Sequence, residues 1–113
     1  MVEELIGEKY YHGFYEKGLW TGEGVLITNE YIYEGNFVKG KFEGEGKKIY
    51  LKMNKILEGE FFLDVYQGRK ITYNNYYYEG DIKNDKANGI GWLHFQNDWI
   101  FEGIFFEDEI FEN

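Results

Sequence analysis

Aromatic and polar residues alternate around a central glycine at several places in the chain, as in Tyr33-Glu34-Gly35-Asn36-Phe37. Alternate residues of a β-strand lie on the same face, so this pattern predicts a strand with both rings on one face and Glu34 on the other. The glycines that lead these motifs are spaced 22, 24, 21 and 23 residues apart and are Gly13, Gly35, Gly59, Gly80 and Gly103. Repetition at this period predicts a stack of similar supersecondary units.

Each motif is followed by a second glycine signal, which predicts a β-hairpin. After Phe37, Gly40 lies where the chain should turn, and Gly44-Glu45-Gly46 begins a return strand with little side chain on the aromatic face. Glycine adopts the positive φ of a tight turn easily, and aspartate, which replaces it at positions 64 and 85, tolerates it better than most residues. One unit is therefore a hairpin of about 22 residues, and its aromatic face needs a neighbouring unit to be buried.

The repeats account for nearly the whole chain and predict a single domain, residues 1–113, without a linker. The units are expected at 11–32, 33–56, 57–77 and 78–100, with a partial unit at 101–113. Residues 3–7 are expected to form a cap strand that pairs with the first unit. About nine or ten antiparallel strands, at roughly 4.8 Å each, predict a sheet about 45 Å long along its stacking axis.

The complete motif, Tyr-x-Gly-x-aromatic-x-x-Gly-x-x-x-Gly-x-Gly, resembles the MORN (membrane occupation and recognition nexus) repeat. Residues 11–24 and 33–46 match it at each defining position. Residues 78–91 match with two departures, and residues 57–70 match weakly. The resemblance implies an all-β fold, a single-layer antiparallel sheet of stacked hairpins without a catalytic centre. It also implies a role in scaffolding, partner binding or lipid contact.

The net charge of −9 and the lack of cysteine narrow the possible functions. An acidic chain with a single arginine is expected to bind neither nucleic acid directly nor membrane lipid, because both present anionic surfaces that require Lys and Arg. A chain without cysteine has no disulfides and no thiolate metal site, which suits the cytoplasm. No apolar run approaches 18 residues, so no membrane-spanning helix is expected.

No pattern of residues points to catalysis, to a cofactor or to a metal. The chain has no Ser or Cys nucleophile, and its glycines do not lie in a phosphate-binding motif. His12 and His94 belong to different units, without the three or four ligands that zinc requires. We therefore expect a protein that is not an enzyme and holds no cofactor.

Two columns of side chains are candidates for binding a partner. The ring column consists of Tyr11, Tyr15, Tyr33, Phe37, Phe61, Tyr78, Phe101 and Phe105. The glutamate column lies on the opposite face and consists of Glu34, Glu58, Glu79 and Glu102. The rings serve either as packed structure or as an open aromatic groove, and the glutamates either as a solvated face or as an acidic stripe for a basic partner.

These columns favour a protein–protein interaction module that holds a segment of an unidentified protein partner against the rings and the glutamates. The alternative is a small acidic inhibitor that blocks a basic nucleic-acid-binding site on a partner enzyme. The strand at residues 100–106 is expected to be an open edge, which invites pairing with another chain. The acids that follow it are expected to keep the protein monomeric, and a dimer through this edge is the alternative. These acids are Glu107, Asp108, Glu109 and Glu112.

Overall fold

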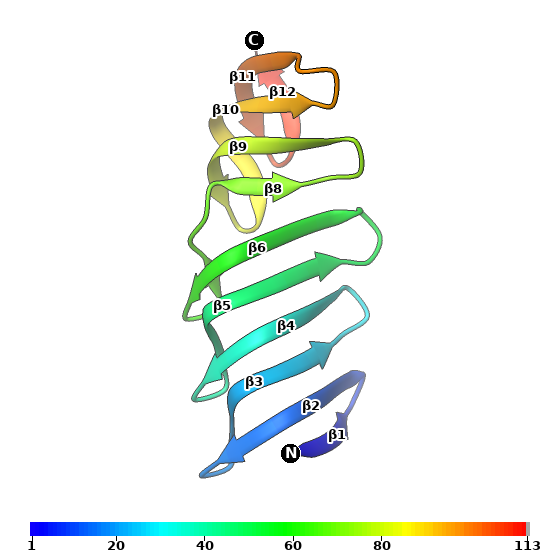
Figure 1. The fold of residues 1–113 in the computed structure, drawn as a ribbon, viewed down its shortest axis with the longest axis vertical. Helices are drawn as coiled ribbons and strands as arrows, with labels where there is room; N and C mark the ends of the chain where they lie inside the picture. The colour runs from blue at the N-terminus through cyan, green and yellow to red at the C-terminus, as the bar shows by residue number, and fades with distance from the viewer. Residues whose placement is uncertain (113) are drawn as a thin grey trace.

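The computed structural model describes residues 1–112, which form one continuous antiparallel β-sheet (Figure 1). Its twelve strands are β1 (Val2–Ile6), β2 (Lys9–Glu16), β3 (Leu19–Ile27), β4 (Tyr31–Val38), β5 (Lys41–Tyr50), β6 (Lys55–Phe62), β7 (Val65–Tyr66), β8 (Lys70–Thr72), β9 (Tyr76–Lys83), β10 (Lys86–Phe95), β11 (Ile100–Phe106) and β12 (Glu109–Glu112). The strands follow one another across the sheet in chain order, and β7 pairs with β6 alongside β8. The all-β hairpin stack that the repeats predict is confirmed.

The sheet has more strands than expected, for two reasons. The return strand of the third unit stops after Tyr66 and resumes at Lys70, so it is divided into β7 and β8. The tail forms β12, which pairs with β11. The prediction that residues 100–106 form an open edge is therefore wrong, whereas the cap strand is confirmed as β1, which pairs with β2.

Five hairpins close through two-residue turns in which both residues have positive φ. The second residue of each turn is Gly18, Gly40, Asp64, Asp85 or Asp108. Turns of this kind match the twist of the flanking strands, and glycine and aspartate reach positive φ more readily than most residues. The turns predicted at positions 40, 64 and 85 are confirmed.

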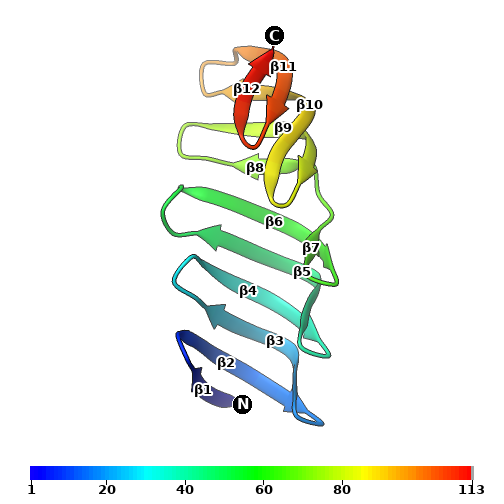
Figure 2. The same ribbon diagram turned by 180° about the vertical axis from the view of Figure 1, so that it is seen from behind.

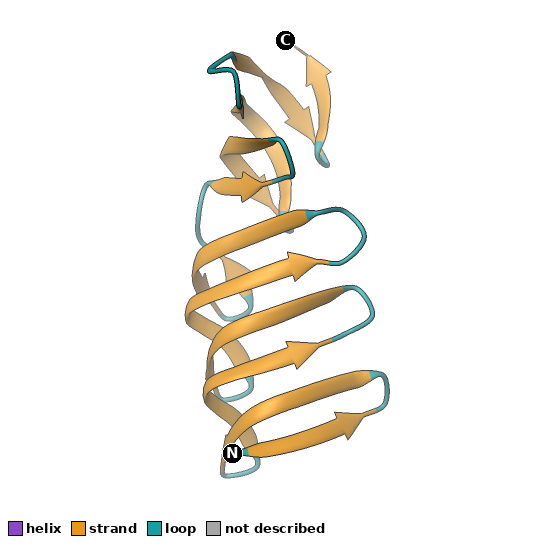
Figure 3. Cartoon of the chain, turned by 45° about the vertical axis from the view of Figure 1, so that its right-hand side comes forward, coloured by secondary structure: helices purple, strands orange, loops and turns teal. Residues whose placement is uncertain are grey.

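The hairpins bend, so the single sheet is curved (Figures 2 and 3). In the β4–β5 hairpin the pairing shifts between Gly35 and Phe37, and Gly44 on the opposing strand has a φ of 89°. The step of two positions from Gly35 to Phe37 on β4 faces a step of four positions from Gly46 to Phe42 on β5, and such a bulge, with extra residues in one strand, bends the hairpin. The molecule measures 49 Å along its longest axis and 22 Å along the other two, close to the predicted length of the stack.

The core lies on the inner face of the curl, where the rings of successive units pack together. Buried side chains there include Tyr33, Phe37, Leu57 and Tyr78. Burial of apolar surface is the main stabilising contribution to such a sheet, and it needs no second layer because the curl supplies the cover. Within residues 1–112 there is no helix with the length and apolarity needed to span a bilayer.

Candidate functional site

The leading tyrosine of three units covers the glycines of its own hairpin. The Tyr33 hydroxyl donates a 2.8 Å hydrogen bond to the carbonyl oxygen of Asn36, and its ring lies against Gly46 on the opposing strand. A methyl group on Gly46 would overlap this ring, so the glycine pair makes room for a buried phenol. Tyr11 and Tyr78 donate in the same way to the carbonyl oxygens three residues later.

The third unit keeps this arrangement although its motif has decayed. Leu57 stands at the tyrosine position, and Tyr66 of the return strand supplies the ring instead. The Tyr66 hydroxyl donates a 2.8 Å hydrogen bond to the carbonyl oxygen of Lys70, and its ring lies against Gly68. A structural tyrosine in this fold can therefore come from either strand of a hairpin.

Six of the eight residues in the ring column are buried, namely Tyr11, Tyr33, Phe37, Phe61, Tyr78 and Phe105. Tyr33 stacks on Phe42 with ring centroids 3.8 Å apart, and it meets Phe37 edge-on at 5.2 Å. Tyr15 and Phe101 are half-buried. Of the two alternatives for this column, packed structure holds at the six buried positions, because the curl of the sheet packs the rings against one another.

All four members of the glutamate column are exposed on the outer face; they are Glu34, Glu58, Glu79 and Glu102. The strand register, however, sets Lys47 opposite both Glu34 and Glu58. It likewise sets Lys70 opposite Glu79. The column is thus interrupted by cations on the intervening strands, and it is not the continuous acidic stripe that the spacing suggested.

The hairpin tip between β9 and β10 folds back onto the end of β5, a contact that the sequence did not predict. Asp85 Oδ2 accepts a 2.6 Å hydrogen bond from Lys48 Nζ and a 2.5 Å hydrogen bond from the Tyr50 hydroxyl. The side chains of Lys48 and Asp85 are 10 % and 13 % exposed. Burial raises the pKa of Tyr50, and the hydrogen bond and charge of Asp85 raise it further.

The tip between β11 and β12 makes a similar contact one unit further along. Asp108 accepts hydrogen bonds of 2.7 Å from Lys55 Nζ, 3.1 Å from the Tyr73 hydroxyl and 2.7 Å from the Ala87 amide. Lys55 is almost completely buried, at 1 % exposure. The expectation that Asp108 guards the sheet edge is therefore wrong, because its carboxylate faces inward. Of the four acids, Glu107, Glu109 and Glu112 are exposed.

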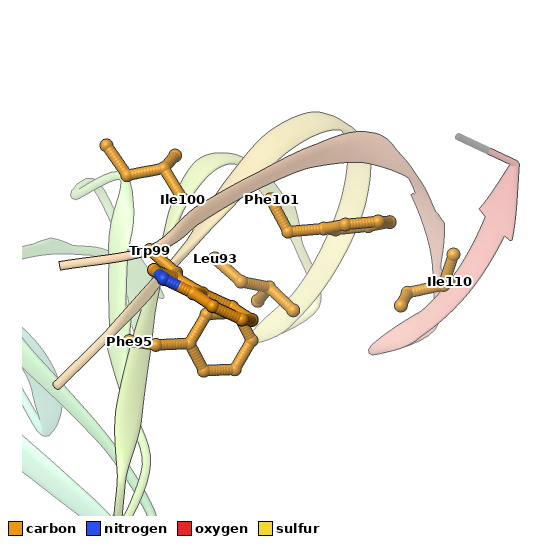
Figure 4. A pocket seen from close by; sticks show the side chains of 6 residues that line it. All are labelled: Leu93, Phe95, Trp99, Ile100, Phe101 and Ile110. Carbon is orange, nitrogen blue, oxygen red and sulfur yellow. The ribbon is translucent and has the colours of Figure 1, made fainter. Parts of the chain in front are cut away.

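An apolar hollow of about 540 Å³ opens at the C-terminal end of the sheet (Figure 4). It is lined by Leu93, Phe95, Trp99, Ile100, Phe101 and Ile110. Figure 4 shows Ile110 of β12 across the hollow from Phe95 and Trp99. Phe101 is the only member of the ring column in this lining. The sequence missed the others because the hollow depends on the inward fold of β12.

The potential metal-ligating side chains of residues 1–112 do not come together in one cluster. No group of three or more potential ligands in this range is arranged to hold a metal ion. His12 contacts Glu3 at 3.3 Å, and His94 contacts Glu79 at 3.1 Å, so each histidine has a single carboxylate neighbour in a salt-bridge arrangement. The C-terminal hollow, by contrast, is lined by apolar side chains.

Comparison with known families gives one match. The family model for the MORN repeat matches residues 11–29, 33–50 and 78–99, which together make up more than half of the chain. The third hairpin lies outside these segments, consistent with Leu57 and Asp64 at its tyrosine and turn positions. The comparison with curated proteins finds no match to the chain. On its repeats, the chain belongs to the MORN repeat family.

Proposed function

We propose that this protein is a non-enzymatic interaction module that binds a segment of a protein partner. MORN repeats are generally protein-interaction scaffolds, and the family is generally not catalytic. The aromatic part of the binding surface is the C-terminal hollow, because most of the ring column is buried. Phe101 is common to both surfaces.

The exposure of large apolar side chains around the hollow is the observation that carries this proposal. Trp99 is 72 % exposed, and Ile100 and Ile110 are each more than half exposed. Contiguous apolar surface of this kind is typical of binding sites, and tryptophan in particular contributes strongly at the centres of protein interfaces. A partner that covered Trp99 would remove a large apolar area from water.

The two strands at the C-terminal end of the sheet favour a basic partner. β11 carries Glu102, β12 carries Glu109 and Glu112, and neither strand contains Lys or Arg. Complementary charge guides association and selects the orientation of the partner. The alternative function, a charge mimic that blocks a nucleic-acid-binding site, gains no comparable support, because cations interrupt the glutamate column on the outer face.

The substitution Trp99→Asp tests the proposal, with Leu5→Asp as its matched control. Leu5 lies on β1 at the opposite end of the sheet and is 74 % exposed, close to the value for Trp99. We expect a partner captured from host extract by the wild type and by Leu5→Asp to be lost with Trp99→Asp. Calorimetry with that purified partner should show the same difference. Equal binding by all three proteins, with thermal melting unchanged, would contradict the proposal.

A further inference from the structure

The C-terminal hollow occupies the last of four equivalent places along the inner face, and the earliest of the four pairs Thr28 with Tyr31. Each place lies where a return strand ends and the next leading strand begins. Among the three places that follow Thr28 and Tyr31, the paired residues are Tyr50 and Lys55 in the first, Tyr73 and Tyr76 in the second, and Phe95 and Trp99 in the third. The three places are structurally equivalent, so a difference in what covers them reflects a difference in side chains and neighbours.

A later hairpin tip covers each of the first two places. The tip that carries Asp85 reaches Tyr50, and the tip that carries Asp108 reaches Tyr73. In both cases an aspartate carboxylate accepts a hydrogen bond from the tyrosine hydroxyl, and a buried lysine neutralises its charge. Each cover therefore comes from the hairpin two units further along the chain.

The third place has different chemistry and lacks such a cover within residues 1–112. Phe95 stands at the tyrosine position, Trp99 at the position of Lys55, and Leu93 at the position of Lys48. Of these three side chains, only Trp99 could donate a hydrogen bond to a carboxylate, through its indole N–H. Burying an aspartate there would be strongly unfavourable, since a buried charge needs a partner. The place is therefore suited to an apolar cover.

We propose that an extended segment of a partner protein, apolar in its centre and flanked by Lys or Arg, adds to the outer edge of β12 and covers the hollow. The inference rests on the proposed function and specifies its partner. β12 is the last strand of the sheet, so its outer edge has no strand partner among residues 1–112. Because Ile110 lines the hollow from β12, a strand added beside it places its apolar side chains next to Ile110.

Charge distinguishes this partner from a second copy of the chain. Two β12 strands paired antiparallel would set Glu109 of one against Glu112 of the other, and like charges opposite each other destabilise a sheet. Pairing of β12 with β1 of another copy would bring Glu3 and Glu4 to the same edge. Lysine or arginine flanks on a different chain would instead meet these glutamates with opposite charge.

Calorimetry with synthetic peptides tests the proposal. The probe alternates Ile, Val and Phe with Thr and has two lysines at each end. A first control peptide carries Glu in place of each Lys, and a second carries N-methyl groups on the amides of one strand edge. We expect the probe to bind at least about tenfold more tightly than either control, because the first loses charge attraction and the second loses main-chain hydrogen bonds.

The protein variants locate the binding. Trp99→Asp and Ile110→Asp should each weaken the probe at least about tenfold, whereas Leu5→Asp should bind like the wild type. No binding of the probe, equal binding of the N-methylated peptide, or a wild-type dimer that assembles through β12 in sedimentation would each overturn the inference. If the probe fails while capture of a protein partner still depends on Trp99, the strand-addition inference falls and the proposed function stands.

Discussion

The place under the β9–β10 tip and the hollow at the C-terminal end are equivalent in backbone and opposite in chemistry. Under the tip, Lys48 and Tyr50 both donate to the carboxylate of Asp85. In the hollow, the corresponding residues are Leu93 and Phe95, and the lining is entirely apolar. The repeated backbone alone therefore does not determine which part of the inner face is closed.

The inward side chains of each place match what covers it. A buried lysine is destabilising without a counter-charge, and both buried lysines of this sheet, Lys48 and Lys55, contact an aspartate. In the hollow, Leu93 and Phe95 stand at the corresponding positions. The apolar surface that they form is covered favourably only by another apolar group. The polar places are thus closed by the fold itself, whereas the apolar hollow stays exposed.

The largest expected effect comes from Asp85→Asn, which removes the charge opposite Lys48. Breaking a buried ion pair from one side costs about 3 kcal/mol, a large part of a typical domain's total stability. We expect the urea midpoint to fall accordingly. Asparagine tolerates the positive φ of this turn, so the loss reports the ion pair and not the backbone.

Asp98→Asn is the matched control for that substitution. Asp98 has a φ of 67°, close to the 64° of Asp85, but it lies in an exposed turn near the hollow. Its substitution should change the stability by less than about 0.5 kcal/mol. Equal losses of stability for Asp85→Asn and Asp98→Asn would show that the Asp85 carboxylate contributes no more to stability than an aspartate in an exposed turn.

Alkaline pH should lower the free energy of unfolding, because several tyrosine hydroxyl groups are buried on the inner face. Burial raises the pKa of Tyr33 and Tyr78 to about 12, and it also raises the pKa of Tyr50. Tyrosine in the unfolded chain ionises near pH 10, so above this pH the unfolded state loses protons that the folded state keeps. The stability from these residues is therefore complete below about pH 10 and falls as the pH rises towards 12.

Urea midpoints at several pH values between 9 and 11.5, together with phenolate absorbance, check this expectation. The midpoint should fall with pH, and the buried tyrosines should ionise only as the protein unfolds. Tyr50→Phe should reduce the dependence on pH, since it removes one buried phenol. A midpoint that stays constant up to pH 11.5 would contradict the burial of these hydroxyl groups.

The repeats could be predicted from the sequence because their signals are local. The spacing from Tyr33 to Phe37 defines one face of a strand, and Gly40 and Asp64 mark turns a few residues later. The role of Tyr66 was harder to predict. Leu57 stands at the tyrosine position of the third unit, and the ring that fills this space comes from the other strand of the hairpin. Local periodicity was sufficient for the hairpins and for their order in the sheet.

The candidate site depends on contacts over long separations, and these could not be predicted from the period. Lys48 and Asp85 are 37 residues apart, and Lys55 and Asp108 are 53 residues apart. They meet because the sheet bends, and the motif does not specify the pairing shifts that accompany the bend in the β2–β3, β4–β5, β9–β10 and β11–β12 hairpins. For the same reason the sequence left two alternatives for the ring column, packed structure and an open groove. Aspartate at the turn position could have indicated these long-range contacts, because glycine would have been sufficient for the turn alone.

Tyr50→Phe should have a smaller effect than Asp85→Asn. It removes one hydrogen bond to Asp85 and leaves the ion pair with Lys48 in place. The loss of one partner from a buried carboxylate costs about 1 kcal/mol. Chemical denaturation at pH 7 measures this loss. A change near zero would indicate that the Tyr50 hydroxyl is not a required part of the cover.

Phe95→Tyr is the reciprocal substitution, and it should have the smallest effect of all. Phe95 is 38 % exposed and borders the open hollow, so an added hydroxyl can reach water and needs no carboxylate. We expect the free energy of unfolding to change by less than about 0.5 kcal/mol. The same hydroxyl under a closed cover would lack a partner and would cost about 1–3 kcal/mol. A loss of that size in the isolated protein would mean that the hollow is closed in solution, and the contrast between the two places would then fail.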